Sequence, residues 1–325
     1  MKTNLSSFLQ WRFNIFIYQK LGWKFSFHYI TGLISIFLFF KKKEKQKLKM
    51  GIESVFALLK QNSEIKTLIK KASKGILFHY YEKLFNAFSS AETLKTFLKT
   101  NVKCQGLMTV NQALSRNKGA LLITGHFGGV ELIPGYLGLN NYPVTIIAKF
   151  SSDHLRKMSI DQGKEFNSKI IDANNTPNIM RAIFNNLKEK RLVITMCDEF
   201  EEWRPSLNDS INFLGKQTNL DRTINILMKR GGAPIIFGLM HRDDNRQYEL
   251  ILKSIEEITD YFNNTQDMSP GEMILKYLEQ YIYKYPEEWY QWKKTPDINT
   301  ITAPDEGPKM PVLPLGLKPA FENAI

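Results

Sequence analysis

The sequence has 325 residues, of which 43% are hydrophobic, so the chain is long enough to bury a large core in one or two domains. Its formal net charge of +12 favours an anionic partner: a nucleic acid, an anionic membrane surface or a phosphorylated substrate. The two cysteines, Cys104 and Cys197, lie far apart in mostly apolar surroundings, which argues against a disulfide framework. The cysteines and histidines also lack the close spacing of zinc ligands, and we expect no metal site.

The N-terminal region carries an apolar run, FSFHYITGLISIFLFF, over residues 25–40, followed at once by KKKEKQKLK. As a helix this run would rise ~24 Å, short of the ~30 Å hydrocarbon core, so it predicts a short span or an interfacial helix. The lysines follow the apolar run, unlike those of a signal peptide. By the positive-inside bias, residues 1–50 are expected to anchor the chain on the cytoplasmic side of the inner membrane. The alternative is a buried amphipathic helix with a solvated lysine cap.

The rest of the chain divides by the spacing of its apolar residues. Residues 51–118 have helical spacing and are expected to form a helical region. Over residues 119–295 short β-rich runs alternate with amphipathic segments, which predicts an α/β core with a mixed central sheet flanked by helices. Within it, 199–218 shows no clean period and is expected to be a long loop. The proline-rich residues 296–325 are expected to form an extended tail. Helices are expected at roughly 129–138, 151–167, 176–189, 219–230 and 268–285.

The stretch LLITGHFGGVE at 121–131 holds the strongest candidate chemistry. The strand would bring His126 to its carboxyl end, where α/β sheets place ligands, and the next helix would point its free N–H groups at the same crevice. Glu131 would hold the imidazole in one tautomer, and the neutral imidazole could act as a general base. Backbone amides around Gly128 and Gly129 would stabilise an oxyanion.

Two alternatives compete for this stretch. A histidine before two glycines can simply belong to a tight turn between a strand and a helix. A nucleotide or S-adenosylmethionine loop is disfavoured, because the GxGxxG spacing is not met and the next strand ends in Lys149 rather than an acidic residue. Two enzyme classes are excluded: the sequence contains no GxSxG elbow of the usual serine hydrolases and no P-loop of the nucleoside triphosphatases.

Several separated motifs resemble the lipid A biosynthesis acyltransferases of the lysophospholipid acyltransferase superfamily. VNQALSRNKGALLITGHFGGVELIPGYLG looks like their first block, with its His-x4-Glu signature, and YPEEWYQWKK at 285–294 resembles their closing segment. Between them lie Lys149, where the family commonly has Arg, Asp198-Glu199, where Asp-Gln is common, and Phe213-Leu214-Gly215, similar to a Phe-Phe-Gly element. The resemblance covers roughly residues 10–295.

The resemblance implies a glycerol-3-phosphate acyltransferase-like fold and transfer of an acyl chain from a thioester to a lipid hydroxyl. His126 and Glu131 would be catalytic, and Lys149 and Asp198 would bind substrate. The acyl donor would be acyl carrier protein or coenzyme A, with no other cofactor, and the acceptor a membrane lipid such as a lipid A precursor or a related glycolipid.

Two other functions stay open. The chain could acylate a different lipid, such as a lysophospholipid or a pigment polyene. It could also be a non-catalytic basic protein bound to a membrane or to nucleic acid. Nucleic acid is disfavoured as a partner, because the densest basic cluster adjoins an apolar segment instead of an arginine-rich or aromatic-interleaved patch.

Overall fold

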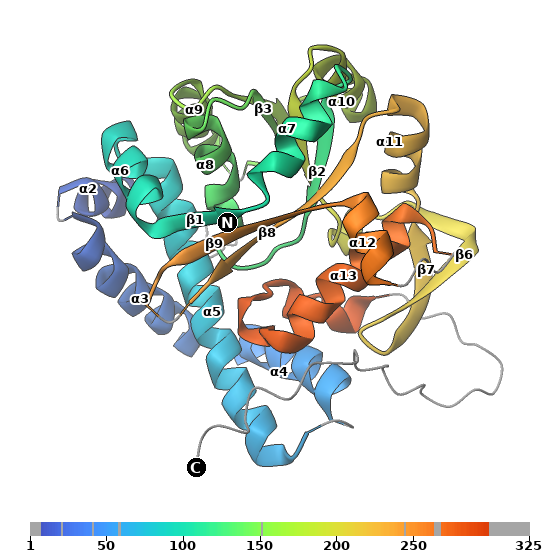
Figure 1. The fold of residues 1–325 in the computed structure, drawn as a ribbon. Helices are drawn as coiled ribbons and strands as arrows, with labels where there is room; N and C mark the ends of the chain where they lie inside the picture. Colours follow the sequence, from blue (N-terminus) through green and yellow to red (C-terminus); the bar gives the residue numbers. More distant parts are fainter. Residues whose placement is uncertain are drawn as a thin grey trace.

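The computed structural model describes residues 8–20, 22–40, 42–57, 60–150, 152–243, 245–262 and 268–298. Its centre is a seven-stranded sheet with the order β1-β9-β8-β2-β5-β3-β4 (Figure 1). Neighbouring strands run parallel except β8 and β9, which are antiparallel, so the sheet is mixed as the sequence predicts. The strands are β1 (Val102–Gln105), β2 (Ala120–Thr124), β3 (Val144–Ala148), β4 (Ser168–Asp172), β5 (Leu192–Met196), β8 (Ile235–Arg242) and β9 (Tyr248–Ser254).

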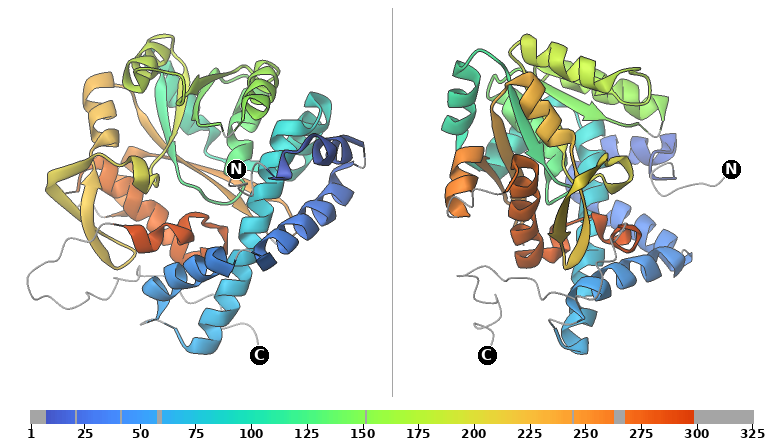
Figure 2. Two further views of the ribbon diagram at one scale, coloured as in Figure 1. Left: turned by 180° about the vertical axis from the view of Figure 1, so that it is seen from behind. Right: turned by 90° about the vertical axis from the view of Figure 1, so that its right-hand side faces the viewer.

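Helices cover both faces of this sheet (Figures 1 and 2). The N-terminal helices are α2 (Arg12–Lys20), α3 (Gly22–Phe40), α4 (Lys42–Phe56), α5 (Asn62–Phe88) and α6 (Ala91–Asn101). Those between and after the strands are α7 (Leu107–Ser115), α8 (Ile133–Leu139), α9 (Asp153–Lys164), α10 (Ile179–Lys188), α11 (Thr223–Gly231), α12 (Ile255–Tyr261) and α13 (Pro270–Lys284).

The sheet separates two hydrophobic cores because successive strand residues point to opposite faces. Leu121 and Ile123 of β2 pack in one core, with α10, α11 and α13, while Ala120 and Leu122 pack in the other, with α6, α7 and α8. All five residues of β2 are buried, which explains why its sequence is a continuous apolar run. The long helix α5 reaches both cores.

Two segments differ from their predicted structure. The region 51–118 contains strand β1, which pairs with β9 at the edge of the sheet. The predicted loop 199–218 instead holds most of a hairpin of β6 (Pro205–Phe213) and β7 (Lys216–Asp221). Its two-residue turn, Leu214-Gly215, has positive φ at both positions, the geometry that suits the twist of a hairpin. Because the first turn position is Leu214 and not a glycine or asparagine, the sequence does not predict this turn. From residue 299 the expected proline-rich tail lies outside the described residues.

The N-terminal apolar run forms α3, but its structure does not support the expected membrane span. One side of α3 is buried through Phe27, Ile30 and Ile34, and Phe27 contacts two aromatic rings of α5. Phe25 and Ile36 on the same helix are more than half exposed. Within the described ranges, none of the helices has the length and hydropathy needed to cross a bilayer.

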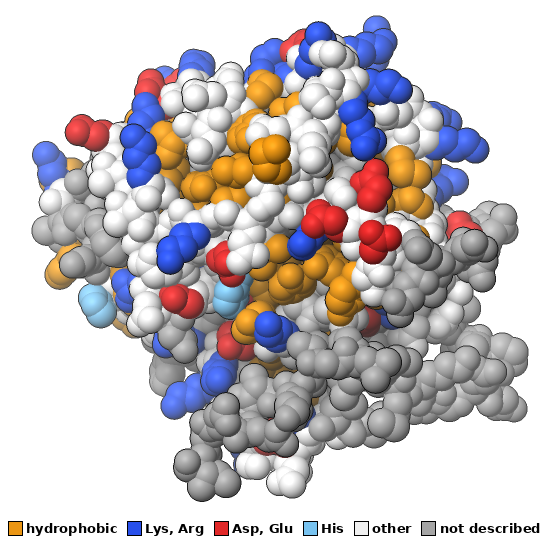
Figure 3. All heavy atoms as spheres, in the orientation of Figure 1, with side chains coloured by type: hydrophobic (Ala, Val, Ile, Leu, Met, Phe, Trp, Pro, Cys, Tyr) orange, Lys and Arg blue, Asp and Glu red, His pale blue; other side chains and the backbone are white. Residues whose placement is uncertain are grey.

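On the face in Figure 3, basic side chains gather along the edge formed by α10 and α11, whereas carboxylates gather over α12. This face therefore carries both signs of charge and does not form one continuous basic surface.

Helix α5 approaches the chain after α13 so closely that Gly75 is required. A methyl group at Gly75 would overlap the backbone carbonyl of Glu287, whereas one at Gly32 of α3 would meet nothing within 4 Å. In a helix, alanine is normally about 1 kcal/mol more favourable than glycine.

We expect Gly75→Ala to reverse that preference and lower the free energy of unfolding by about 1–3 kcal/mol, because backbone atoms must shift. Gly32→Ala is the matched control and should be neutral or stabilising. Thermal unfolding of both variants measures the difference, and equal stability of the two would contradict the close approach.

Candidate functional site

The site forms where β2 and β5 end side by side. The two strands are parallel neighbours with Thr124 opposite Met196, so residues two positions beyond each also meet. These residues are His126 and Asp198. Asp198 Oδ1 lies 2.8 Å from Nδ1 of the imidazole, and Asp198 Oδ2 accepts a hydrogen bond from the His126 backbone N–H at 2.9 Å. A single carboxylate therefore holds both the backbone and the ring of the histidine.

Asp198 is fully buried, and its position is set by a third donor. The indole N–H of Trp289 donates to Asp198 Oδ2 at 2.8 Å. The amide nitrogen of Gln291 lies 2.9 Å from His126 Nδ1. Trp289 and Trp292 of this segment are both buried. Trp289 in addition orients the carboxylate that holds the histidine.

The loop that carries His126 is tied to the same C-terminal segment by backbone hydrogen bonds. The N–H of Tyr290 donates to the His126 carbonyl at 3.0 Å, and the Tyr290 hydroxyl donates to the Gly128 carbonyl. Beneath them Glu288 accepts from the Arg242 backbone N–H at 2.8 Å, and Arg242 forms a buried ion pair with Glu82 of α5 at 2.6 Å. Segments 160 residues apart therefore fix the backbone around the histidine.

The amides of Gly128 and Gly129 are not free to form the predicted oxyanion hole. Gly128 N–H donates to the Glu288 carbonyl at 2.9 Å, and Gly129 N–H donates to the Met240 carbonyl at 3.0 Å. Gly128 has a positive φ of 54°, and a side chain there would overlap the Met240 carbonyl. The glycines instead let the loop turn tightly against β8.

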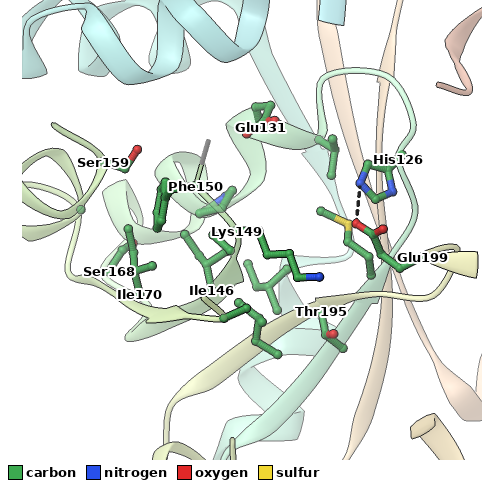
Figure 4. A pocket seen from close by; sticks show the side chains of 18 of the residues that line it. His126, Glu131, Ile146, Lys149, Phe150, Ser159, Ser168, Ile170, Thr195 and Glu199 are labelled. Atoms are coloured by element: carbon green, nitrogen blue, oxygen red, sulfur yellow. Dashed lines mark ion pairs between the residues drawn. The ribbon is translucent and has the colours of Figure 1, made fainter. Parts of the chain in front are cut away.

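The expected contact between Glu131 and His126 is not formed. Residues Val130–Leu132 make a short 3₁₀ turn, and the Glu131 carboxylate lies 4.0 Å from the ammonium of Lys83 on α5. The sequence spacing of five residues suggested a helical turn that would fold the carboxylate back; the 3₁₀ turn directs it away. Figure 4 shows Glu131 apart from His126, although both line the same pocket.

Lys149 and Glu199 face this pocket from the ends of β3 and β5 (Figure 4). Lys149 forms an ion pair with Glu202. Glu199 Oε1 lies 3.2 Å from Nε2 of His126, the imidazole nitrogen that Asp198 leaves free. The sequence did not single out Glu199 as a site residue beyond its departure from the family pattern.

The pocket has a volume of about 410 Å³, within the range of sites for small ligands. Its mouth is charged, with Lys83, Glu131, Lys149 and Glu199 near His126. Away from the histidine its wall is mostly apolar and includes Ile146, Phe150, Leu155, Phe166, Ile170, Ile183 and Leu227. Among the described residues, no group of three or more His, Cys, Asp and Glu side chains is placed to hold a metal ion.

The two carboxylates determine the protonation of the histidine in this structure. Burial by itself lowers the pKa of His126, but the charge and hydrogen bond of Asp198, with those of Glu199, outweigh it and raise the pKa to about 10. The hydrogen bond from His126 lowers the pKa of Glu199 to about 2. The two carboxylates therefore favour the protonated form of His126 over the neutral imidazole.

Residues 4–294 match the model of the bacterial lipid A biosynthesis acyltransferases. The chain belongs to this family. It is therefore an acyltransferase. The matched residues include the separated sequence motifs on which the resemblance was based. No protein of curated function matches the chain. In this acyltransferase the family's closing segment lies directly against the histidine of its first block.

Asp198→Asn tests whether Asp198 orients His126. The substitution should lower kcat by at least roughly 10³-fold, as loss of the orienting aspartate does in serine proteases. The His126 backbone N–H and the Trp289 indole would hold the amide oxygen, so the amide NH2 would face Nδ1 and the Nδ1 proton would lose its acceptor. Adding Asp198→Asn to His126→Ala should cost little more, since the two residues act as a unit.

Asp172→Asn is the matched control, because Asp172 also ends a strand and forms an ion pair, with Arg156 at 2.5 Å. Acyl-transfer rates and thermal unfolding should be measured for each variant. A loss in Asp198→Asn no greater than that in Asp172→Asn would overturn the assignment.

Proposed function

We propose that the protein transfers a fatty acyl chain from an acyl thioester to a hydroxyl of a lipid A precursor or a related glycolipid, with His126 as general base. The observation that carries the proposal is the placement of His126: Asp198 holds Nδ1, and the ring lines a pocket with charged residues near the histidine and a mostly apolar wall elsewhere. This is the arrangement of a catalytic triad in which the substrate supplies the nucleophile.

The reaction proceeds by addition and elimination at the thioester carbonyl. Nε2 of His126 takes the proton from the acceptor hydroxyl while the oxygen bonds to the carbonyl carbon. The tetrahedral intermediate then collapses, the carbon–sulfur bond breaks, and the imidazolium returns its proton to the leaving thiolate. Asp198 keeps the Nδ1 proton in place through both steps. No covalent enzyme intermediate is required.

The pocket supports this assignment of substrates. Its apolar wall offers a site for the acyl chain, because burying each methylene stabilises binding by about 0.8 kcal/mol. Lys149 and Lys83, at the mouth, are cations suited to a phosphate of the donor arm or of the acceptor, or to the oxyanion. The pantetheine arm is common to acyl carrier protein and coenzyme A, so both donors fit this mouth.

The proposed reaction takes place at the cytoplasmic face of the inner membrane. The N-terminal segment with α2 and α3 exposes large apolar side chains to more than half of their full area. They are Trp11, just before α2, and Phe13, Phe16, Phe25 and Ile36 within the two helices. Aromatic residues of this kind favour the boundary between head groups and acyl chains, and the lysines of α4 would bind anionic head groups. We therefore propose an interfacial mode of attachment.

His126→Ala tests the catalytic proposal. The variant should lose acyl transfer to a lipid A precursor while it stays folded, because the substitution removes the group that takes the proton of the acceptor hydroxyl. His154→Ala, which removes an exposed histidine stacked on Phe88, should keep its activity.

The assay follows a labelled acyl group from acyl carrier protein and, separately, from coenzyme A, with a lysophospholipid as a second acceptor. Undiminished transfer by His126→Ala would contradict the mechanism. Preference of the wild type for the lysophospholipid would reassign the acceptor.

The membrane proposal predicts that Trp11→Ser with Phe13→Ser weakens binding to anionic vesicles about tenfold or more, since two exposed aromatic side chains no longer insert. Co-sedimentation with phosphatidylglycerol vesicles measures it. Met108→Ser, an equally exposed apolar residue on α7, is the control and should leave binding unchanged. Equal vesicle binding by the double variant and the wild type would exclude this surface.

A further inference from the structure

A second carboxylate occupies the position at His126 that a substrate hydroxyl must take. Glu199 Oε1 lies 3.2 Å from Nε2, while Asp198 already satisfies Nδ1 (Figure 4). A general base must be within hydrogen-bond reach of the proton it removes. The acceptor hydroxyl and the Glu199 carboxylate therefore compete for one nitrogen.

Glu199 has a second partner on the side away from the histidine. The ammonium of Lys294 lies 3.6 Å from Glu199 Oε2 and 3.5 Å from Glu201 Oε2. Lys294 belongs to the C-terminal segment that also places Trp289 and Gln291 on Asp198 and His126. A carboxylate displaced from Nε2 therefore has a cation within reach.

From the structure and the proposed reaction, on which this inference rests, we propose that Glu199 is a positioning residue that closes the substrate-free site. It holds the imidazole protonated until the acceptor hydroxyl displaces it from Nε2 toward Lys294. Displacement removes one of the two carboxylates that stabilise the imidazolium, so the Nε2 proton passes to solvent water while Glu199 leaves as a carboxylate. The neutral histidine then accepts the proton of the acceptor hydroxyl, and it becomes a base only when an acceptor is present.

The surrounding charges favour this exchange. Asp198 lies on the opposite nitrogen and stays there in both states. Lys149 acts on Glu199 through its charge, but it is engaged by Glu202 on the 3₁₀ turn Phe200–Glu202. The other charged groups around the site are the Lys83–Glu131 pair, which lines the pocket, and the buried Arg242–Glu82 pair with Glu288. His79 of α5 also interacts electrostatically with His126.

A closed resting site has a chemical advantage. Thioesters react with water as well as with hydroxyls, and a neutral imidazole beside a bound thioester would activate water. An imidazolium paired with Glu199 cannot do so. Closure thus favours transfer to the acceptor over hydrolysis of the donor.

Three variants test the proposal, each with a predicted direction. Glu199→Gln keeps an oxygen that can accept from Nε2–H but removes the charge, so the pKa of His126 should fall by about one unit or more, a tenfold change in the ratio of neutral to charged imidazole. The acid limb of acyl transfer should move to lower pH with it, and hydrolysis of the acyl thioester without acceptor should increase. Lys294→Met should move the acid limb to higher pH, because the displaced carboxylate loses its cation.

Glu201→Gln is the matched control. The substitution removes a negative charge two residues from Glu199 and an ion-pair partner of the same lysine, Lys294. Glu201 is mostly exposed, however, and it is Glu199 that is paired with His126. It should leave the acid limb and the hydrolysis rate near the wild-type values.

The direct measurement is an NMR titration of histidine-labelled protein without substrate, with the His126 signal assigned by its loss in His126→Ala. A lower His126 pKa in Glu199→Gln, with no such change in Glu201→Gln, supports the proposal. Coincident titration of Glu199→Gln and wild type overturns it, as does an equal shift in Glu201→Gln. A third result would also overturn the proposal: Lys294→Met shifts the His126 pKa by the same amount in the Glu199→Gln background as in the wild type. The lysine would then act on His126 directly and not through Glu199.

The titration does not depend on turnover, so it separates the two proposals. An active His126→Ala variant refutes the general-base mechanism whatever the titration shows. An inactive His126→Ala variant with an unchanged titration in Glu199→Gln refutes the role of Glu199 alone.

Discussion

The site depends on one contact, that of Asp198 with His126, and this contact follows from the register of two parallel strands. Because Thr124 of β2 lies opposite Met196 of β5, the residues two positions further on leave the sheet together. The aspartate then accepts from the histidine ring and from its backbone, and its burial prevents water from competing for either bond. The pocket, the free Nε2 and the role of Glu199 all follow from this fixed orientation of the ring.

The closing segment of the chain makes that orientation stable. The Trp289 indole donates to Asp198, and the backbone of Tyr290 is bonded to that of His126. A buried tryptophan supplies a large apolar surface and one directed donor, which suits it to fix a carboxylate inside a core. The first and last motifs of the family are thus two sides of a single site, and Gly75 and Gly128 let the backbones approach closely enough for both to reach it.

Charge gives the site its second constraint. An imidazole between two carboxylates strongly favours the protonated form, which serves a proton donor better than a proton acceptor. The proposed displacement of Glu199 resolves this conflict without moving Asp198. It also gives a physical role to the negative charge of residue 199, which acts on Nε2 of His126.

The sequence by itself determined the family, the mixed α/β class and His126 as the central residue, because these follow from local periodicity and from motifs that chain order preserves. It also brought Asp198 into the candidate site, through the family resemblance, as a substrate-binding residue. Only the tertiary structure decided that Asp198, and not Glu131, holds the imidazole, since strand order and register are long-range properties. Three further features could not be predicted for the same reason: the bonded amides of Gly128 and Gly129, the hairpin over 205–221 and the contacts of Trp289. Each depends on how the backbone packs in three dimensions. The spacing of residues along the chain does not indicate which distant backbone will lie against a given segment.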